Sequence, residues 1–162
     1  MKNIMGVIVV ILLFIVPFGS WYYLQSGLDY RKDALKQLQP KEDVTSFIGD
    51  PSFLAGRTTL IQFRDINEAV LPEYFDQYKE SHTFLLVSNQ SPSIIDKRWK
   101  QMDAFMSASF KNHYQDAAMV LVDTSMMVRN IYTSSPQDIT KMIEQTAIIL
   151  PRVKEVDIKM KK

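Results

Sequence analysis

The longest apolar stretch of the chain lies near its N-terminus. Residues 4–24 form a run of 21 positions without a charged side chain. As a helix rising 1.5 Å per residue, the run spans roughly 30 Å, the thickness of a bilayer's hydrocarbon core. Trp21, Tyr22 and Tyr23 close the run, and such amphipathic rings suit the headgroup level. The pattern therefore predicts a single transmembrane anchor.

Two alternatives to an anchor share this composition. A cleaved signal peptide would have a shorter apolar region and a small-residue cleavage site, and residues 17–21 (Pro-Phe-Gly-Ser-Trp) contain no Ala-x-Ala pattern. A helix buried in a protein core is the second alternative. Lipid attachment through a cysteine thiol is excluded, because the chain contains no cysteine.

The charges that flank the run indicate its orientation only weakly. Lys2 precedes the run, and the basic residues that follow it are interleaved with Asp29 and Asp33. By the positive-inside rule, this distribution slightly favours a cytoplasmic C-terminal domain. The basic residues after the run are Arg31, Lys32 and Lys36.

After the anchor, the hydrophobic positions follow two periodicities. Short β-branched and aromatic runs predict strands, and apolar residues at i, i+3 and i+4 predict amphipathic helices. In chain order the pattern is strand, helix, strand, helix, β-hairpin, helix, and the first two strands are expected to be parallel. The predicted strands are 58–63, 83–88, 117–122 and 127–132, and the predicted helices are 68–79, 91–110 and 136–150.

Particular residues define the ends and faces of these elements. Ser135 is expected to cap the last helix with Pro136 at its first position, and Pro151 to end it. Residues 28–38 can be helical, and residues 43–56, rich in turn formers, are expected to form a lead-in segment with a hairpin. The side of the last helix that faces the sheet is expected to carry Ile139, Met142, Ile143 and Ala147. One side of helix 91–110 is expected to carry Ile94, Ile95, Trp99, Met102, Phe105 and Met106. The buried strand residues are expected to be Phe63, Leu85, Leu86, Val120 and Leu121.

The order of elements is that of the thioredoxin fold, an α/β fold with a central mixed sheet flanked by helices. The predicted organisation is a transmembrane anchor (1–25), a tether (26–42), a thioredoxin-like domain (43–151) and a basic C-terminal tail (152–162). A domain of this length can bury a core without disulfides. The tail is interpreted most simply as a solvated terminus, the alternative being contact with lipid headgroups or a partner.

Composition excludes several classes of function. The net charge is +1, and no cluster of Lys and Arg with interleaved aromatic residues indicates nucleic-acid binding. The lack of cysteine removes disulfides, thiol redox chemistry and thiolate metal sites. Five glycines leave little material for a phosphate-binding loop, and Ser125, Ser134 and Ser135 have no neighbouring His–Asp pair to activate them. We therefore expect neither catalysis nor a cofactor.

The layout of the chain resembles the Sco/SenC proteins, membrane-anchored thioredoxin-fold copper proteins of cytochrome oxidase assembly. The resemblance is most specific at residues 117–124 (Ala-Ala-Met-Val-Leu-Val-Asp-Thr), which look like the family's penultimate strand ending in Asp. Residues 128–132 and 136–150 look like its final strand and last helix, and residues 22–40 look like the lead-in of bacterial members. The resemblance implies a domain outside the cytoplasm, against the weak charge count.

The copper ligands of the resembled family are missing from this chain. Family members bind copper through Cys-x-x-x-Cys after the first core strand and a His shortly before the penultimate strand. The matching positions hold Glu68, Pro72 and Gln115, and His113 lies two residues before the last of these. Copper binding and thiol chemistry are therefore not carried over, and the chain looks like a degenerate relative.

Three groups of residues remain weak candidates for chemistry. Asp65 and Glu68 lie where a thioredoxin-type fold displays its reactive residues, but acidic residues there also complement a helix dipole. His113 could belong to a small metal or proton site, although a histidine without further ligands is more often polar surface; His82 is weaker still. Methionine thioethers bind copper(I), but at regular spacing they usually fill the core. The methionines concerned are Met102, Met106, Met119, Met126 and Met127.

The leading hypothesis is a noncatalytic, membrane-tethered thioredoxin-like protein that acts by protein contact. From the resemblance, its partner would be a membrane complex, as in assembly or structure of cytochrome oxidase. One alternative is a copper chaperone with non-thiolate ligands, and another is an anchored scaffold of an unrelated envelope complex.

Overall fold

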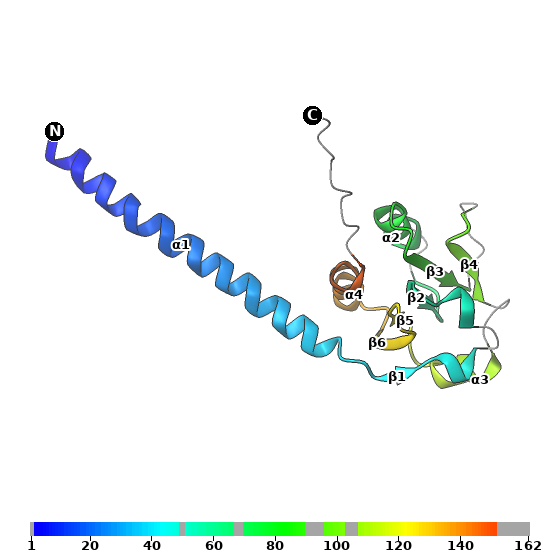
Figure 1. Cartoon of the computed structure of the whole chain (residues 1–162). Coiled ribbons are helices and arrows are strands. Elements are labelled where there is room, and N and C mark those ends of the chain that lie inside the picture. The colour runs from blue at the N-terminus through cyan, green and yellow to red at the C-terminus, as the bar shows by residue number, and fades with distance from the viewer. Residues whose placement is uncertain (1, 49–50, 67–69, 90–95, 103–106, 152–162) are drawn as a thin grey trace, which may run out of the picture. The chain divides into compact units, whose positions relative to one another are not determined.

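The computed structural model describes residues 2–48, 51–66, 70–89, 96–102 and 107–151 (Figure 1). The chain divides into two compact units, Met1–Gln37 and Leu38–Lys162. Glu68 and Met106, together with most of the predicted helix 91–110, lie outside the described residues.

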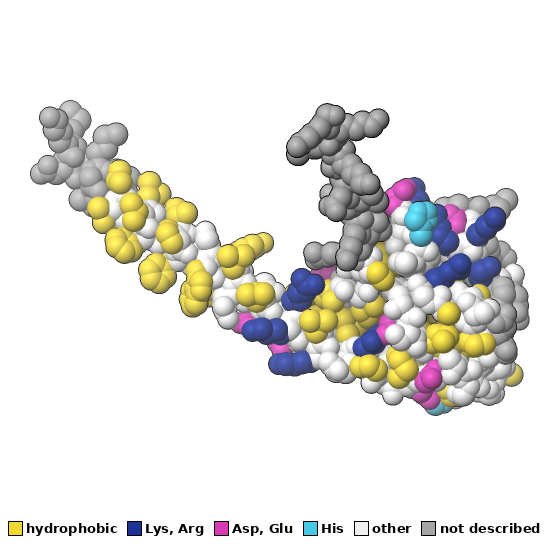
Figure 2. Space-filling model, viewed as in Figure 1, with side chains coloured by type: hydrophobic (Ala, Val, Ile, Leu, Met, Phe, Trp, Pro, Cys, Tyr) yellow, Lys and Arg dark blue, Asp and Glu magenta, His cyan; other side chains and the backbone are white. Residues whose placement is uncertain are grey.

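The first unit is a single helix, α1 (Lys2–Gln37). Its large hydrophobic side chains from Val9 to Val16 are 48–66% exposed. Figure 2 shows hydrophobic side chains along much of this helix. Within the described residues, this helix alone is long and apolar enough to cross a membrane, and none of its apolar window is buried. That exposure argues against a core helix and agrees with a segment able to anchor in a membrane.

The second unit is built on a six-stranded mixed sheet with the order β1-β6-β5-β2-β3-β4. The pairs β2–β3 and β3–β4 are parallel, whereas β2–β5, β5–β6 and β6–β1 are antiparallel. The order β6-β5-β2-β3, with β5 antiparallel to both neighbours, is the thioredoxin arrangement, so the predicted fold class is confirmed. The strands are β1 (Glu42–Asp43), β2 (Thr58–Gln62), β3 (Phe84–Ser88), β4 (Trp99–Gln101), β5 (Met119–Val122) and β6 (Met127–Tyr132).

Helices cover both faces of this sheet (Figure 1). Helices α2 (Val70–Tyr78) and α4 (Pro136–Ile149) pack on one face, and α3 (Ala108–His113) packs on the other with the 3-10 helices η1 (Thr45–Phe47) and η2 (Pro51–Phe53). Of the predicted core residues, four are fully buried and Phe63 is only partly buried, because it lies just beyond the end of β2. The four are Leu85, Leu86, Val120 and Leu121.

The last helix begins as predicted but presents a different face. The Ser135 Oγ accepts a hydrogen bond from the Asp138 backbone N at 3.2 Å, and Pro136 follows the cap. Met142 is fully buried, but Ala147 is exposed; the buried position of this turn is Thr146, whose hydroxyl contacts the Tyr74 hydroxyl at 2.7 Å. The prediction that Ala147 faces the sheet was therefore wrong. The buried hydrogen bond between Thr146 and Tyr74 requires Thr146 to face the sheet in its place.

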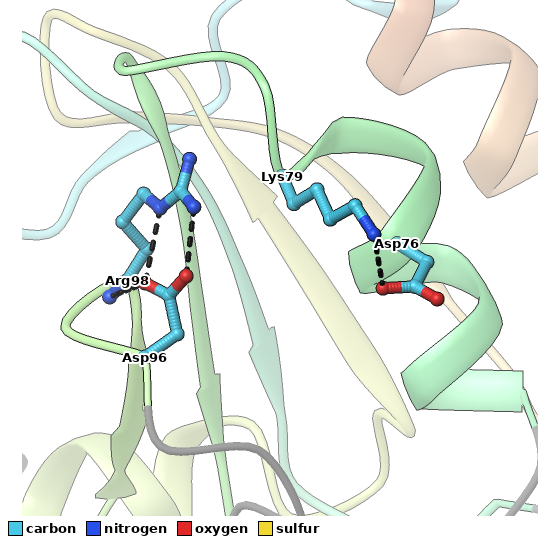
Figure 3. Close-up of polar contacts among 4 residues, drawn as sticks. All are labelled: Asp76, Lys79, Asp96 and Arg98. Carbon is cyan, nitrogen blue, oxygen red and sulfur yellow. Dashed lines mark hydrogen bonds and ion pairs between the residues drawn. The ribbon is translucent and has the colours of Figure 1, made fainter.

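The predicted helix 91–110 is wrong wherever the structure describes it before residue 107. Trp99–Gln101 forms β4 instead, parallel to β3. Asp96 starts a turn that competes with a helix: its carboxylate accepts hydrogen bonds from the Arg98 backbone N and from the guanidinium, at 2.7–3.0 Å (Figure 3). These bonds lower the pKa of Asp96 to about 2. The Trp99 indole then donates to the Ser88 Oγ at 2.8 Å, a partner on the neighbouring strand.

The predicted hairpin within residues 43–56 is also wrong for the described part of that segment. η1 and η2 occupy it, and its one strand, β1, pairs with β6 rather than with a neighbour in sequence. The backbone N of Lys41 also donates to the Val128 carbonyl at 2.9 Å. Gly56 lies in a turn (φ 73°), as its residue type predicts, but the strand that pairs with β1 lies more than eighty residues away along the chain.

Candidate functional site

Several polar residues gather at the edge of the sheet where β2 and β3 end. Because these strands are parallel, their carboxyl ends lie together, and β5 begins at the same edge. In α/β sheets this is the edge at which ligands usually bind. We call residues 62–66, Asn89 and residues 115–118 the polar edge.

Arg64 links the two segments of the polar edge. Its Nε donates to the Gln115 carbonyl at 2.8 Å, and its guanidinium pairs with the Asp116 carboxylate at 3.2 Å. The backbone N atoms of Phe63 and Arg64 both donate to the Ala118 carbonyl, at 2.8 and 3.3 Å. The side chains of Arg64 and Asp116 are 56% and 93% exposed, so the ion pair itself contributes little stability.

Two amide side chains complete the polar edge. Asn89 donates from Nδ2 to the Phe63 carbonyl at 2.6 Å. Gln62 donates from Nε2 to the Arg64 carbonyl at 3.0 Å, whereas its buried Oε1 has no hydrogen-bond partner within the described structure. These bonds hold the loop after β2 in place. Each joins a side-chain amide to a backbone carbonyl, and neither involves a group with unusual reactivity.

Of the three positions that match the ligands of the resembled family, the structure describes Pro72 and Gln115. It brings Gln115 to the loop that follows β2, through its backbone carbonyl and Arg64. Asp65 is exposed on that loop, and Pro72 is partly buried in the first turn of α2. Glu68, the remaining position, is outside the described residues. No local pattern indicates the Arg64 link, because it joins residues 51 positions apart.

His113 is the last residue of α3 and lies beside β1. Its Nε2 is 3.1 Å from the Glu42 Oε2, and its ring stacks on Phe47 with the centroids 5.1 Å apart. The Tyr114 hydroxyl donates to the same Glu42 oxygen at 2.6 Å. Burial, and then the Glu42 carboxylate, raise the pKa of Tyr114 above its ordinary range. His113 thus helps to hold β1 against α3.

The methionine candidates are distributed between the core and a turn. Met102 and Met119 are buried. Met126 and Met127 are partly buried, and Met126 adopts a left-handed backbone conformation (φ 63°) in the turn between β5 and β6. Among the described residues, no group of three His, Cys, Asp or Glu side chains is arranged to hold a metal ion. His82 is exposed in the turn before β3.

Asp123 accepts several hydrogen bonds at one end of the sheet, a role that the amino-acid pattern does not indicate. It is 4% exposed and directly follows β5. One carboxylate oxygen accepts from the backbone N atoms of Ser125 and Met127 at 2.8 and 2.9 Å, and the other accepts from the Arg129 guanidinium. Arg129 also donates to the Leu38 carbonyl at 3.1 Å. Asp123 therefore fixes the hairpin and, through Arg129, the start of the domain.

Comparison with known proteins adds one similar structure. No protein-family model matches the chain, and no curated protein matches it. Among solved structures, the chain is similar to a SCO1/SenC family lipoprotein from Bacillus anthracis str. Ames, with 11% sequence identity and a TM-score of 0.39. The alignment covers 61% of this chain and 84% of that one. The fold assignment therefore rests on the strand order and pairing of this chain itself.

Proposed function

We propose that this protein is a noncatalytic, membrane-tethered thioredoxin-like protein that acts by contact with another protein. The observation that carries the proposal is the chemistry of the polar edge. Where a thioredoxin-like fold displays reactive groups, this chain has Arg64 bonded to Gln115 and Asp116. A guanidinium, an amide and an exposed carboxylate are suited to recognising another polar surface. Catalysis or metal binding would instead require a thiol, a nucleophile with its base, or a set of metal ligands.

The class of partner comes from the sequence resemblance to Sco/SenC proteins. On that basis, the partner is a protein of a respiratory membrane complex, and the contact serves the assembly or structure of cytochrome oxidase. The apolar helix α1 supports the membrane part of the proposal, because it would keep the domain close to such a complex. The domain would then lie on the extracytoplasmic side.

A photoreactive residue placed at Asp65 tests the contact. Asp65 is exposed on the polar edge, and His82 is exposed on the turn before β3, at the opposite end of the sheet. In native membranes, the probe at Asp65 is expected to form a discrete adduct that mass spectrometry identifies as a respiratory-complex protein, and the probe at His82 is not. An adduct with an unrelated envelope protein would favour the scaffold alternative, and equal labelling from both positions would contradict a contact at the polar edge.

Copper(I) competition tests the chaperone alternative. The positions that match the ligands of the resembled family hold Glu68, Pro72 and Gln115, and neither a proline nor a neutral amide supplies a deprotonated soft ligand. Fragment 28–162 is therefore expected to lose copper(I) to a chelator as readily as any methionine-containing surface. Stoichiometric binding that survives the chelator, and is lost in His113→Ala or Met126→Ala, would replace the contact proposal with the chaperone.

A reporter fusion tests the orientation. A reporter that is active only in the cytoplasm, fused after Lys162, is expected to be silent, because the resemblance places the domain outside. The matched control carries the same reporter after Lys2, on the other side of α1, where activity is expected. Strong activity at Lys162 would support the weak charge count instead and would remove the extracytoplasmic assignment.

A further inference from the structure

A small open hollow adjoins the polar edge, between the end of α3 and the end of β6. Its volume is about 230 Å³. Sites for small molecules usually measure roughly 300–1,000 Å³, so this hollow is small for a cofactor or substrate. It has room for one large side chain.

The centre of the hollow is apolar. Ile131, on β6, is 44% exposed, and it is the one large hydrophobic side chain so exposed in the described part of the second unit. It lies opposite Val120 of β5, on the face of the sheet that α3 covers, and α3 leaves it partly uncovered. Ala117, Tyr114 and Tyr132 complete the apolar lining.

The polar side chains on the rim of the hollow already have partners within the domain. The pairs are Asp116 with Arg64, His113 with Glu42, and Thr133 with Asp138. Among the described residues that line the hollow, no charge is therefore left for a charged occupant to neutralise. An exposed apolar centre within a paired polar rim fits an apolar side chain.

The hollow is continuous with the polar edge, because Asp116 and Ala117 belong to both. Protein interfaces commonly combine an apolar centre with a polar, solvent-accessible rim. Ile131 supplies such a centre, and the side chains of Arg64 and Asp116, exposed beside it, supply part of the rim. The two features together form one surface suited to contact with a protein.

We propose that a large aliphatic or aromatic side chain of the partner protein docks in this hollow against Ile131. This inference rests on the proposed function and adds the chemistry of the partner. The partner presents a bulky apolar residue flanked by polar groups that meet Arg64 and Asp116. A basic side chain and a second copy of this chain are the other occupants that the experiment distinguishes.

The experiment uses the full-length chain in native membranes, with the photoreactive residue at Asp65, and measures the yield of the identified adduct. Ile131→Asp and Ile131→Lys place a charge of either sign in the hollow, whereas Ile131→Val keeps it apolar. Gln77→Asp is the matched control for an added charge, because Gln77 is exposed on α2, the helix on the other face of the sheet. Resistance of the domain to limited proteolysis, in the same membranes, checks that each variant is folded.

Both charged substitutions of Ile131 are expected to lower the adduct yield at least about tenfold, because docking would remove water from the new charge. Ile131→Val and Gln77→Asp are expected to keep the yield within about threefold of the unsubstituted protein.

Three outcomes would overturn the proposal. Opposite effects of Ile131→Asp and Ile131→Lys would show a charged occupant, an adduct between two copies of the chain would show self-association, and unchanged yields would place the hollow outside the contact. If the unsubstituted protein formed no adduct from Asp65, the proposed function itself would fail, and this inference with it.

Discussion

Replacing Asp123 with alanine is expected to lower the free energy of unfolding by about 3–5 kcal/mol, the usual cost of removing one partner from a buried, hydrogen-bonded charge pair. Two backbone N–H groups, of Ser125 and Met127, would lose their acceptor together with the Arg129 guanidinium. The Arg129 side chain is only 25% exposed, so water replaces the lost carboxylate poorly. The expected loss is a large share of the stability of a domain of this size.

Urea unfolding of fragment 28–162, followed by fluorescence, measures this change. Trp99 is the only tryptophan in that fragment, and it is 4% exposed in the folded domain. Asp116→Ala serves as the matched control, because the Asp116 side chain is 93% exposed and its pairing with Arg64 should contribute less than about 1 kcal/mol. If Asp123→Ala changed stability no more than Asp116→Ala does, the hairpin would not depend on the buried carboxylate.

Truncation of Leu121 to alanine is expected to lower the free energy of unfolding by about 2–5 kcal/mol. Leu121 is fully buried on β5, which lies between β2 and β6, and it belongs to the core cluster that α2 and α4 cover. Alanine would leave a cavity in the centre of this cluster, because the backbone on both sides is fixed by strand pairing.

The same urea experiment measures the effect of this truncation, and a lowered midpoint with an unchanged slope is expected. Ile131→Ala on the neighbouring β6 is the matched control, since Ile131 is 44% exposed and its truncation should cost much less. Equal midpoints for Leu121→Ala and the unsubstituted fragment would show that β5 is not central to the core.

The elements that the sequence predicted well are those that local physics determines. The exposed apolar helix α1 follows from a run without charges, and the strands β2, β3, β5 and β6 follow from short β-branched and apolar runs. The start of α4 follows from a serine cap and a proline within two residues of each other. Given these elements in this order, few arrangements of strands are possible, which is why the thioredoxin fold could be predicted.

The errors occurred where a distant partner outweighs a local pattern. Residues 91–110 show helical spacing, yet Trp99 pairs with β3 and places its indole against Ser88. Ala147 fits the apolar stripe of α4, yet the buried Tyr74–Thr146 hydrogen bond determines which side of the helix faces the sheet. In both cases the buried side chain gains a hydrogen bond that an amphipathic pattern does not describe.

By itself, the sequence determined the apolar helix that could anchor in a membrane, the fold class and the lack of any thiol, because each depends on composition or on the order of locally determined elements. Only the tertiary structure revealed that Arg64 closes the polar edge against Gln115 and Asp116, that Glu42 pairs with His113, and that Asp123 holds the hairpin. The first two contacts join residues 51–71 positions apart. Such contacts depend on how strands are brought side by side, and no periodicity along the chain records them.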